Sequence, residues 1–553
     1  MSISTDREAP VVPDQRRSGG LATLPAPAPT SVPETGSALP SPPTDAEKWW
    51  YLGRQHRWLL ALQAVSFALI AYSVARFATA DVRLLLFLVP MTLYAVTLVI
   101  SLFSGSRRRR FDRVDHLITV HGWAPAVMPS VTVMLPSAGE PLDILRNTYG
   151  HVRRLEWDGD LEVLVLDDSD RPEVAAMAAE FGFRYLVRPD RGFLKKAGNL
   201  RFGYENSTHD LIAILDADFC PRPDFLRELA PYFDDPAVGI VQSPQFYDTR
   251  RKGMGWLERS AGATQELFYR MIQPSRDRVG AAICVGTCAL YRRAALEQAG
   301  GFAQIGHSED VHTGVKLMKV GFRVQYVPVL LTKGLCPDGV AAFLNQQYRW
   351  CSGSMALLRD KEFHETSALT TRQRLCFWAG FLYYISTAVN AVVAPLPALA
   401  MVWLLPSWVE PMNSIWLVGA LSLWFVVLPL VMRGKWRLQV LRVQHLYSFA
   451  HLTAIRHILT NGTREWVATG AVSSGTPLAQ SIGRTVRWYV AATQVLLWVG
   501  LARGAAAYGL DEYWVMIALA VVAAYVQVPL MFLRTGVRRP RSARRSSRRS
   551  ADA

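Results

Sequence analysis

The stretch LIAILDAD, residues 211–218, decides the fold that this sequence predicts. Five apolar residues followed directly by two carboxylates are typical of a buried strand whose end carries acidic side chains into a cleft. In open α/β sheets, ligands bind at the carboxyl ends of the strands. Asp216 and Asp218 therefore lie where a divalent cation is wanted, and their oxygens suit Mg²⁺ or Mn²⁺. An isolated pair of this kind is more often a solvated turn, so the rest of the chain has to decide between the two interpretations.

The segment around this stretch, residues 113–360, predicts an α/β domain. Short β-rich runs alternate there with helical stretches such as 173–181 and 224–233. This alternation is the βαβ pattern of a mostly parallel sheet. The expected strands are 131–135, 161–166, 184–187, 211–215 and 239–241.

Apolar runs on both sides of this domain predict a membrane protein. The chain has 553 residues, a positive mean hydropathy and only 19% charged residues. A further segment, 440–459, carries arginines and histidines among its apolar residues and fits a helix lying in the membrane interface. Six runs have about the length of a bilayer span, namely 58–77, 82–103, 377–405, 415–432, 490–501 with its flanks, and 513–532.

The formal net charge of +15 comes largely from arginines beside these apolar runs. Clusters at 107–110, 433–437 and 534–549 have the distribution of charges that keep loops cytoplasmic and touch anionic lipid. No aromatic-rich basic surface or binding motif accompanies the charge, so nucleic acid is not an expected partner. We expect a multi-pass protein of the plasma (cytoplasmic) membrane, with its central domain and both termini in the cytoplasm.

These patterns divide the chain into five parts. The six cysteines form no C-x-x-C pair and no second pair at zinc-site spacing, which indicates reduced structural thiols. The expected parts are a disordered tail at 1–48, two transmembrane helices at 49–110, a cytosolic domain at 111–360, interfacial helices with about four transmembrane helices at 361–533, and a basic disordered tail at 534–553.

Two further candidate site residues precede the stretch at 211–218. One lies at the end of an expected strand, and the other lies beside a turn of small residues. Asp167 follows the second expected strand, where a carboxylate can accept a hydrogen bond from a nucleobase or ribose, or cap a helix. Lys196 lies beside the turn Ala197-Gly198, where a lysine can act as a point charge on a diphosphate, or as simple surface charge. Together with Asp216 and Asp218, these residues indicate a metal-bound nucleotide diphosphate.

Two later motifs supply what a transfer reaction still lacks. Asp310 ends the motif Ser308-Glu309-Asp310 before an expected helix. It could take a proton from an acceptor hydroxyl, which is typically worth about 10²- to 10⁴-fold, or it could be an acidic first-turn residue. Arg349 can neutralise a leaving diphosphate and Trp350 offers a flat face for a sugar, although such a pair near a bilayer is more often an interfacial anchor.

The ordered set of motifs resembles the processive family 2 glycosyltransferases of the cellulose synthase type. The motifs are Asp167-Asp168, Asp216-Ala217-Asp218, Ser308-Glu309-Asp310 and Gln346-x-x-Arg349-Trp350, with membrane spans on both sides. The resemblance implies a cytosolic glycosyltransferase A-type domain with a mostly parallel sheet, inserted between membrane helices that form a channel for the polymer.

By position, the resemblance assigns Asp167 and Lys196 to the nucleotide, and Asp216 with Asp218 to the diphosphate and its Mg²⁺ or Mn²⁺. Asp310 becomes the catalytic base. The remaining assignments are Gln346 and Arg349 at the diphosphate end, Trp350 as the acceptor platform, and Gln242, Gly286 and Thr287 at the border of the acceptor sugar.

The activity that the resemblance implies is inverting transfer from a UDP-sugar, foremost UDP-glucose, to a growing β-linked polysaccharide that is exported. A UDP-N-acetylglucosamine polymerase, a transferase acting on a lipid-linked acceptor, and an inactive scaffold or transporter are the alternatives. Accessory membrane or cell-envelope subunits are possible partners. The family's gating loop corresponds to 464–476, which lacks its Lys-Gly pair, and no regulatory β-barrel follows the last span. We therefore expect no intrinsic control by cyclic-di-GMP.

Overall fold

The computed structural model describes residues 39–52, 58–79, 81–105, 109–422, 426–431, 437–460 and 476–533. Its centre is a seven-stranded sheet with the order β3-β2-β1-β4-β7-β6-β8. The strands are β1 (Val131–Ser137), β2 (Leu161–Asp167), β3 (Arg184–Leu186), β4 (Leu211–Ile214), β6 (Val238–Gln242), β7 (Ala289–Arg292) and β8 (Arg323–Tyr326).

The sheet is mostly parallel, as the sequence predicts. Strand β1 pairs in parallel with β2 and β4, and β2 pairs in parallel with β3. The exception is β7, which is antiparallel to both β4 and β6. All five expected strands are confirmed within two residues at each end, whereas β7, β8 and the small sheet of β5 (Cys220–Pro221) with β9 (Thr332–Lys333) were not expected.

The sheet is buried on both faces, which explains the near-continuous apolar runs in its strands. Because successive side chains of a strand point to opposite faces, Leu211 and Ala213 join one apolar core with Leu215, and Ile212 and Ile214 join another. Strand β4 thus lies at the middle of the domain core, and Asp216 comes two residues after its end.

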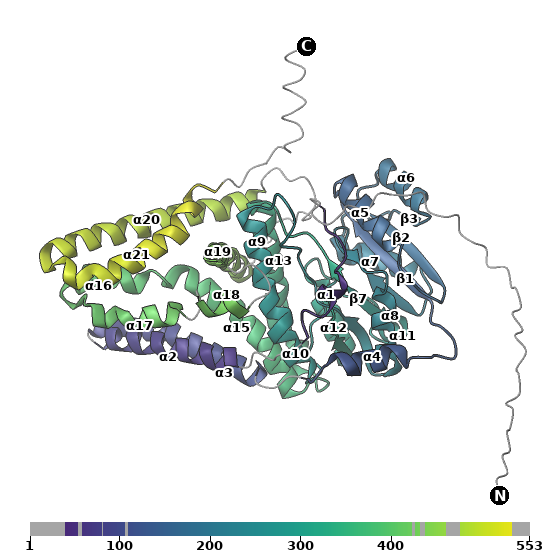
Figure 1. The fold of residues 1–553 in the computed structure, drawn as a ribbon, viewed down its shortest axis with the longest axis horizontal. Helices are drawn as coiled ribbons and strands as arrows, with labels where there is room; N and C mark the ends of the chain where they lie inside the picture. Colours follow the sequence, from purple (N-terminus) through teal and green to yellow (C-terminus); the bar gives the residue numbers. More distant parts are fainter. Residues whose placement is uncertain are drawn as a thin grey trace, which may run out of the picture. The chain divides into compact units, whose positions relative to one another are not determined.

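Helices cover the sheet and its ends. In Figure 1, α5 and α6 lie close to strands β1 to β3, and α7 contacts β1 and β2. The predicted helix at 173–181 is α6, which begins with a proline and ends at Gly182 in the left-handed conformation. The helices of this part are α4 (Arg113–His121), α5 (Leu142–Val152), α6 (Pro172–Phe181), α7 (Lys195–Glu205), α8 (Phe225–Leu229), α9 (Trp256–Leu267), α10 (Gln273–Asp277), α11 (Arg293–Gln298), α12 (Glu309–Lys319), α13 (Val340–Arg359) and α14 (Lys361–Glu365).

Five helical segments in the described part of the chain are long and apolar enough to cross a membrane. They are Trp58–Ala78, Val82–Ser104, Thr371–Leu404, Pro477–Tyr508 and Leu510–Met531. The last two, α20 and α21, pack along each other (Figure 1). The sixth predicted span, 415–432, includes α17 (Pro411–Ser422) and α18 (Leu428–Val431) but also residues outside the described ranges, so it stays a prediction.

The segment expected to lie in the membrane interface is helix α19 (Gln439–Leu459). It packs against α13, α15 (Thr371–Val393) and α9, and it buries polar side chains such as Arg442 and His451. Its helical structure is confirmed, and its depth in a bilayer stays a prediction. The predicted gating loop at 464–476 lies outside the described residues except for Thr476, and the basic tail at 534–553 lies outside them entirely.

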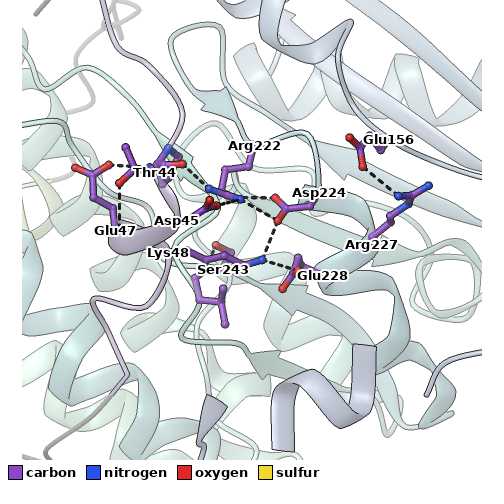
Figure 2. A network of polar contacts seen from close by, with 12 residues as sticks. Thr44, Asp45, Glu47, Lys48, Glu156, Arg222, Asp224, Arg227, Glu228 and Ser243 are labelled. Carbon is purple, nitrogen blue, oxygen red and sulfur yellow. Dashed lines mark hydrogen bonds and ion pairs between the residues drawn. The ribbon is translucent and has the colours of Figure 1, made fainter. Parts of the chain in front are cut away.

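Residues 39–48 correct the predicted boundary of the N-terminal tail. They include the short helix α1 (Asp45–Lys48) and lie against the α/β domain. Figure 2 shows the reason: Lys48 Nζ lies 2.8 Å from Asp224 Oδ2 and 2.6 Å from Glu228 Oε1, and Arg222 pairs with Asp45 at 2.8 Å. These partners are more than 170 residues away in sequence, so a local composition pattern could not reveal them.

Candidate active site

Asp216 and Asp218 lie in a tight turn at the end of β4. The backbone N–H of Asp216 donates to Thr287 Oγ1 at 2.9 Å, and its carbonyl accepts from the N–H of Phe219 at 3.0 Å. Burial, together with the carboxylates of Asp216 and Glu140, raises the pKa of Asp218 to about 8. The turn therefore concentrates carboxylates in one place, and a cation there would relieve their repulsion.

Lys196 connects this turn to a second loop. It lies in the first turn of α7, after Leu194 and Lys195 in the left-handed conformation. Its ammonium donates to the carboxylate of Asp216 and, at 2.7 Å, to the carbonyl oxygen of Gly286. Burial disfavours the charge of Lys196, but the carboxylates of Asp216 and Glu309 outweigh it and raise its pKa.

The loop at 285–288 adjoins Lys196, Asp216 and Asp310. Gly286 has a φ of +74°, and a Cβ on it would lie 2.9 Å from Asp310 Oδ2. Only glycine fits this position, because a side chain would be strained by the backbone and would also collide with Asp310. Thr287 is fully buried and holds the backbone of Asp216.

Gln242 lies behind this loop. Its side chain is 0% exposed. Its Nε2 donates to the carbonyl of Thr287 at 2.9 Å and to that of Ser243 at 2.7 Å, and its Oε1 accepts from the N–H of Val285 at 2.9 Å. The amide therefore has its partners within the protein and supports Gly286 and Thr287 from below.

Asp310 lies in the first turn of α12. Its Oδ1 accepts from the N–H of Val311 at 2.8 Å. Burial and the neighbouring Glu309 raise the pKa of Asp310 to about 7, and the Lys196 ammonium opposes this rise. A carboxyl group with a pKa near neutrality suits a general base.

Helix α13 brings the last predicted residues to the site. Gln346 is nearly buried, and its Nε2 donates to the hydroxyl of Tyr247 at 3.4 Å. Burial lowers the pKa of Arg349, while the carboxylates of Glu309 and Asp216 oppose this. Trp350 follows in the same helix and is half-buried.

Asp167 is placed differently from the other predicted residues. It is 0% exposed. Its carboxylate accepts from the N–H groups of Ser169 at 2.9 Å and Arg171 at 3.0 Å, and from the hydroxyls of Tyr185 at 3.1 Å and Ser137 at 3.3 Å. A carboxylate offers about four acceptor positions, so Asp167 here organises the turn after β2, and a direct contact with a nucleobase requires that turn to open.

A buried arginine that no sequence pattern predicted joins these parts. Arg188 is 1% exposed. Its Nε and Nη2 donate to the two oxygens of Asp168 at 2.6 and 2.7 Å, and its Nη1 donates to the carbonyl of Phe193 at 2.6 Å. This fork fixes the segment before Lys196 to the end of β2. Glu140 and Tyr247 are also near the paired aspartates and were not predicted as site residues.

The donor set fits a divalent cation that is shared with a ligand. Among the described residues, no group of three or more His, Cys, Asp or Glu side chains is arranged to hold a metal ion. Asp216 and Asp218 nevertheless provide two hard oxygen donors at a point of carboxylate repulsion. Mg²⁺ in particular is usually bound by one or two carboxylates together with substrate phosphates, and this turn offers such a pair.

The chain is similar to known glycosyltransferases. The chain matches the model of glycosyl transferase family group 2 over residues 211–434. The UDP-forming cellulose synthase 1 catalytic subunit of Komagataeibacter xylinus is 33% identical over 260 residues, which are 46% of this chain and 34% of that protein. The UDP-forming cellulose synthase catalytic subunit of Xanthomonas axonopodis pv. citri is 31% identical over 260 residues, 46% of this chain and 36% of that protein.

The chain thus spans about a third of the length of these two relatives. Among solved structures, a mannosyltransferase of Pyrobaculum calidifontis in complex with GDP-Man and Mn²⁺ aligns with 73% of this chain and 100% of its own, with 18% identity and a TM-score of 0.48. The family match begins at the first residue of β4 and includes the loop at 285–288, Asp310 and the motif of α13.

Proposed function

We propose, from the match of residues 211–434 to the model of glycosyl transferase family group 2, that the protein transfers a sugar from a UDP-sugar, foremost UDP-glucose, to the end of a growing β-linked polysaccharide. The relatives named above are UDP-forming cellulose synthase subunits. The observation that carries the proposal is the meeting of Lys196, Asp216 and Asp310 around Gly286, although these residues come from four separate segments.

The reaction is a single displacement at the anomeric carbon. The acceptor hydroxyl oxygen forms the new bond to this carbon while the bond to the diphosphate oxygen breaks and UDP leaves. Asp310 accepts the hydroxyl proton, and its raised pKa supports this role. One base without a second carboxylate nucleophile gives inversion of configuration.

The charge that develops on the leaving diphosphate needs cations. Lys196 and Arg349 are basic side chains whose charges interact with Asp216 and the acids of α12. Asp216 and Asp218 would hold Mg²⁺ or Mn²⁺, which supplies further positive charge to the diphosphate when it is bound. Asp167 would serve the nucleotide, together with the turn that it organises.

The acceptor lies on the side of α13 and the 285–288 loop. We assign Trp350 as the stacking platform for the terminal sugar and Gln346 to the diphosphate end. Gly286 and Thr287 border the acceptor, and Gln242 keeps this loop in place through its hydrogen bonds.

The membrane part would export the product. The five membrane-length helices lie in the chain on both sides of the α/β domain. We propose a multi-pass protein of the plasma membrane, with the catalytic domain and both termini in the cytoplasm, which works alone or with accessory membrane or cell-envelope subunits.

The deciding experiment uses the full chain in lipid nanodiscs. It is incubated with a panel of UDP-sugars and Mg²⁺ or Mn²⁺, and UDP release and product mass are measured. Release with UDP-glucose and a long glucan supports the proposal. Turnover only with UDP-N-acetylglucosamine changes the sugar, and a single-sugar glycolipid as the only product refutes the polymerase. Absence of UDP release with every sugar, and no difference from Asp310→Asn, indicates an inactive scaffold or transporter.

A further inference from the structure

Gly353 in α13 lies against the turn that begins α12. A Cβ on Gly353 would lie 2.1 Å from Ser308 Oγ and 2.4 Å from Ser308 Cβ. The same glycine presents its carbonyl oxygen 3.1 Å from Nε2 of His312, one turn further along α12. The backbone of Gly353 therefore packs directly against the side chain of Ser308, and no methyl group fits between them.

This contact lies between the two halves of the site. Asp310 is two residues after Ser308, and Arg349 is four residues before Gly353 in the same helix. Residues four apart lie on the same face of a helix, so Arg349 faces the α12 side as Gly353 does. How closely α13 packs against Ser308 therefore sets the distance between Arg349 and Asp310.

Gly353 and Ser308 each have a backbone conformation or position that lowers the stability of the fold. A glycine inside a helix costs about 0.5–1 kcal/mol relative to alanine, and Gly353 lies in the interior of the 20-residue helix α13. Ser308 has a φ of +55°, which costs an L-residue about 1–2 kcal/mol. Two such choices facing each other are typical of a place where geometry is retained at the expense of stability.

We propose that Gly353 is a positioning residue, which lets α13 approach the Ser308 turn closely enough for Arg349 and Trp350 to act on the same sugar as Asp310. The inference rests on the proposed function, because it needs Asp310 as the base. It assigns no chemical step to Gly353 itself.

The test begins with Gly353→Ala in the full chain. The added methyl group has to move α13 away from Ser308, and a displacement of about 1 Å at a reacting centre can cost about 10²-fold in rate. We expect a kcat about 10²-fold lower and a smaller rise in the Kd for UDP, because Lys196, Asp216 and Asp218 lie on other elements and only the contacts from α13 are displaced. The KM-against-kcat split separates this outcome from general damage.

The compensating variant makes the test specific. Ser308→Gly removes the two atoms that would lie closer than 3 Å to the new methyl group, leaves the carbonyl oxygen of His307 at 3.2 Å, and also relieves the positive φ. The double variant Gly353→Ala/Ser308→Gly should therefore recover the kcat of Ser308→Gly alone. Gly150→Ala is the matched control, because Gly150 lies in helix α5 with nothing within 4 Å of the added Cβ. It should keep full activity.

The melting temperature gives a second readout that needs no activity. Gly353→Ala should lower the melting temperature, and adding Ser308→Gly should restore it. Unchanged kcat and melting temperature in Gly353→Ala, or a double variant no better than the single one, would overturn the inference. The proposed function fails by a different result, namely no UDP release by the wild-type protein, and the melting-temperature cycle still decides whether the contact constrains α13.

Discussion

The ammonium of Lys196 lies 2.7 Å from the carbonyl oxygen of Gly286. The same ammonium donates to the carboxylate of Asp216. One side chain therefore fixes the start of α7 to the end of β4 and to the loop that faces Asp310. This places a positive charge between the acids that would hold the metal and the acid that would accept the proton.

Lys196→Met should remove the positive charge that lies between these carboxylates. Because removal of a preorganised donor to a developing negative charge typically costs about 10²- to 10³-fold, we expect a loss of this size in kcat/KM for the UDP-sugar. UDP release measures it. Lys195→Met is the control, since Lys195 is the adjacent residue in the same turn and is not placed on the diphosphate. Equal losses in both variants would contradict the assignment.

Gly286→Ala should damage the site through Asp310. The new methyl group would lie 2.9 Å from Asp310 Oδ2, at a φ of +74°. Gly182→Ala is a matched control, because its φ is +72° and nothing lies within 4 Å of its added Cβ. Both variants should lose about 1–2 kcal/mol of stability from the backbone, but only Gly286→Ala should lose kcat. Comparing melting temperature and UDP release for the pair checks this directly.

The pKa of Asp310 predicts how activity depends on pH. A base has to be deprotonated, so kcat/KM should rise with pH and level off above about 7, where burial and Glu309 have placed the pKa. Asp310→Asn should lower the rate about 10²- to 10⁴-fold and remove this rise. A rate that falls with increasing pH through this range would show that another group limits the reaction.

The raised pKa of Asp310 also affects the free energy of unfolding, which should change with pH in the opposite direction to the activity. The folded state holds the proton of Asp310 more tightly than the unfolded chain, whose carboxyl has the ordinary pKa of 3.8. Stability should therefore decrease as the pH rises from about 4 to about 7. In Asp310→Asn this part of the pH dependence should disappear, and chemical denaturation at several pH values measures it.

The sequence predicted those parts of the fold that depend on local pattern. Strand β4 could be found because five apolar residues precede Asp216, and α6 because a proline and a glycine mark its ends. Strand β7 could not be found, because its antiparallel place between β4 and β6 depends on distant partners. The expectation that polar side chains at strand ends lie together rested on the shared edge of parallel strands; Lys196 does meet Asp216 there, whereas Asp167 is held in its own turn after β2.

The supporting residues of the site were beyond sequence reasoning. Gln242 was expected beside the acceptor, but its buried amide bonds to the backbone of 285–288. Arg188 gave no signal, because an arginine in a loop is usually exposed, and only the folded chain shows its fork on Asp168. Burial and long-range hydrogen bonding decide such roles, and neither has a local pattern.

Arg188→Lys tests this support. Lysine keeps the charge but cannot form the bidentate fork on Asp168, and hydrogen bonds to charged groups contribute about 1.5–3 kcal/mol. We expect a loss of stability of this order and a higher KM for the UDP-sugar, because the segment before Lys196 is released. Arg146→Lys is the control, since its ion pair with Glu180 is about half exposed on both sides. A higher KM in both variants would contradict the role of Arg188.

Metal binding at Asp218 should release a proton. Burial and the carboxylates of Asp216 and Glu140 raise the pKa of Asp218 to about 8, and a coordinating carboxylate has to be deprotonated. The increase in melting temperature caused by Mn²⁺ with UDP should therefore grow as the pH rises from about 6 to about 8, whereas a surface effect of the ion would not depend on this group. Calorimetry in two buffers of different ionisation enthalpy counts the released proton.

Asp218→Asn should remove both signals and the metal-dependent UDP release. Asp143→Asn is the control, because Asp143 is an exposed aspartate of α5, and it should keep them. Metal-dependent turnover that survives in Asp218→Asn would place the cation elsewhere.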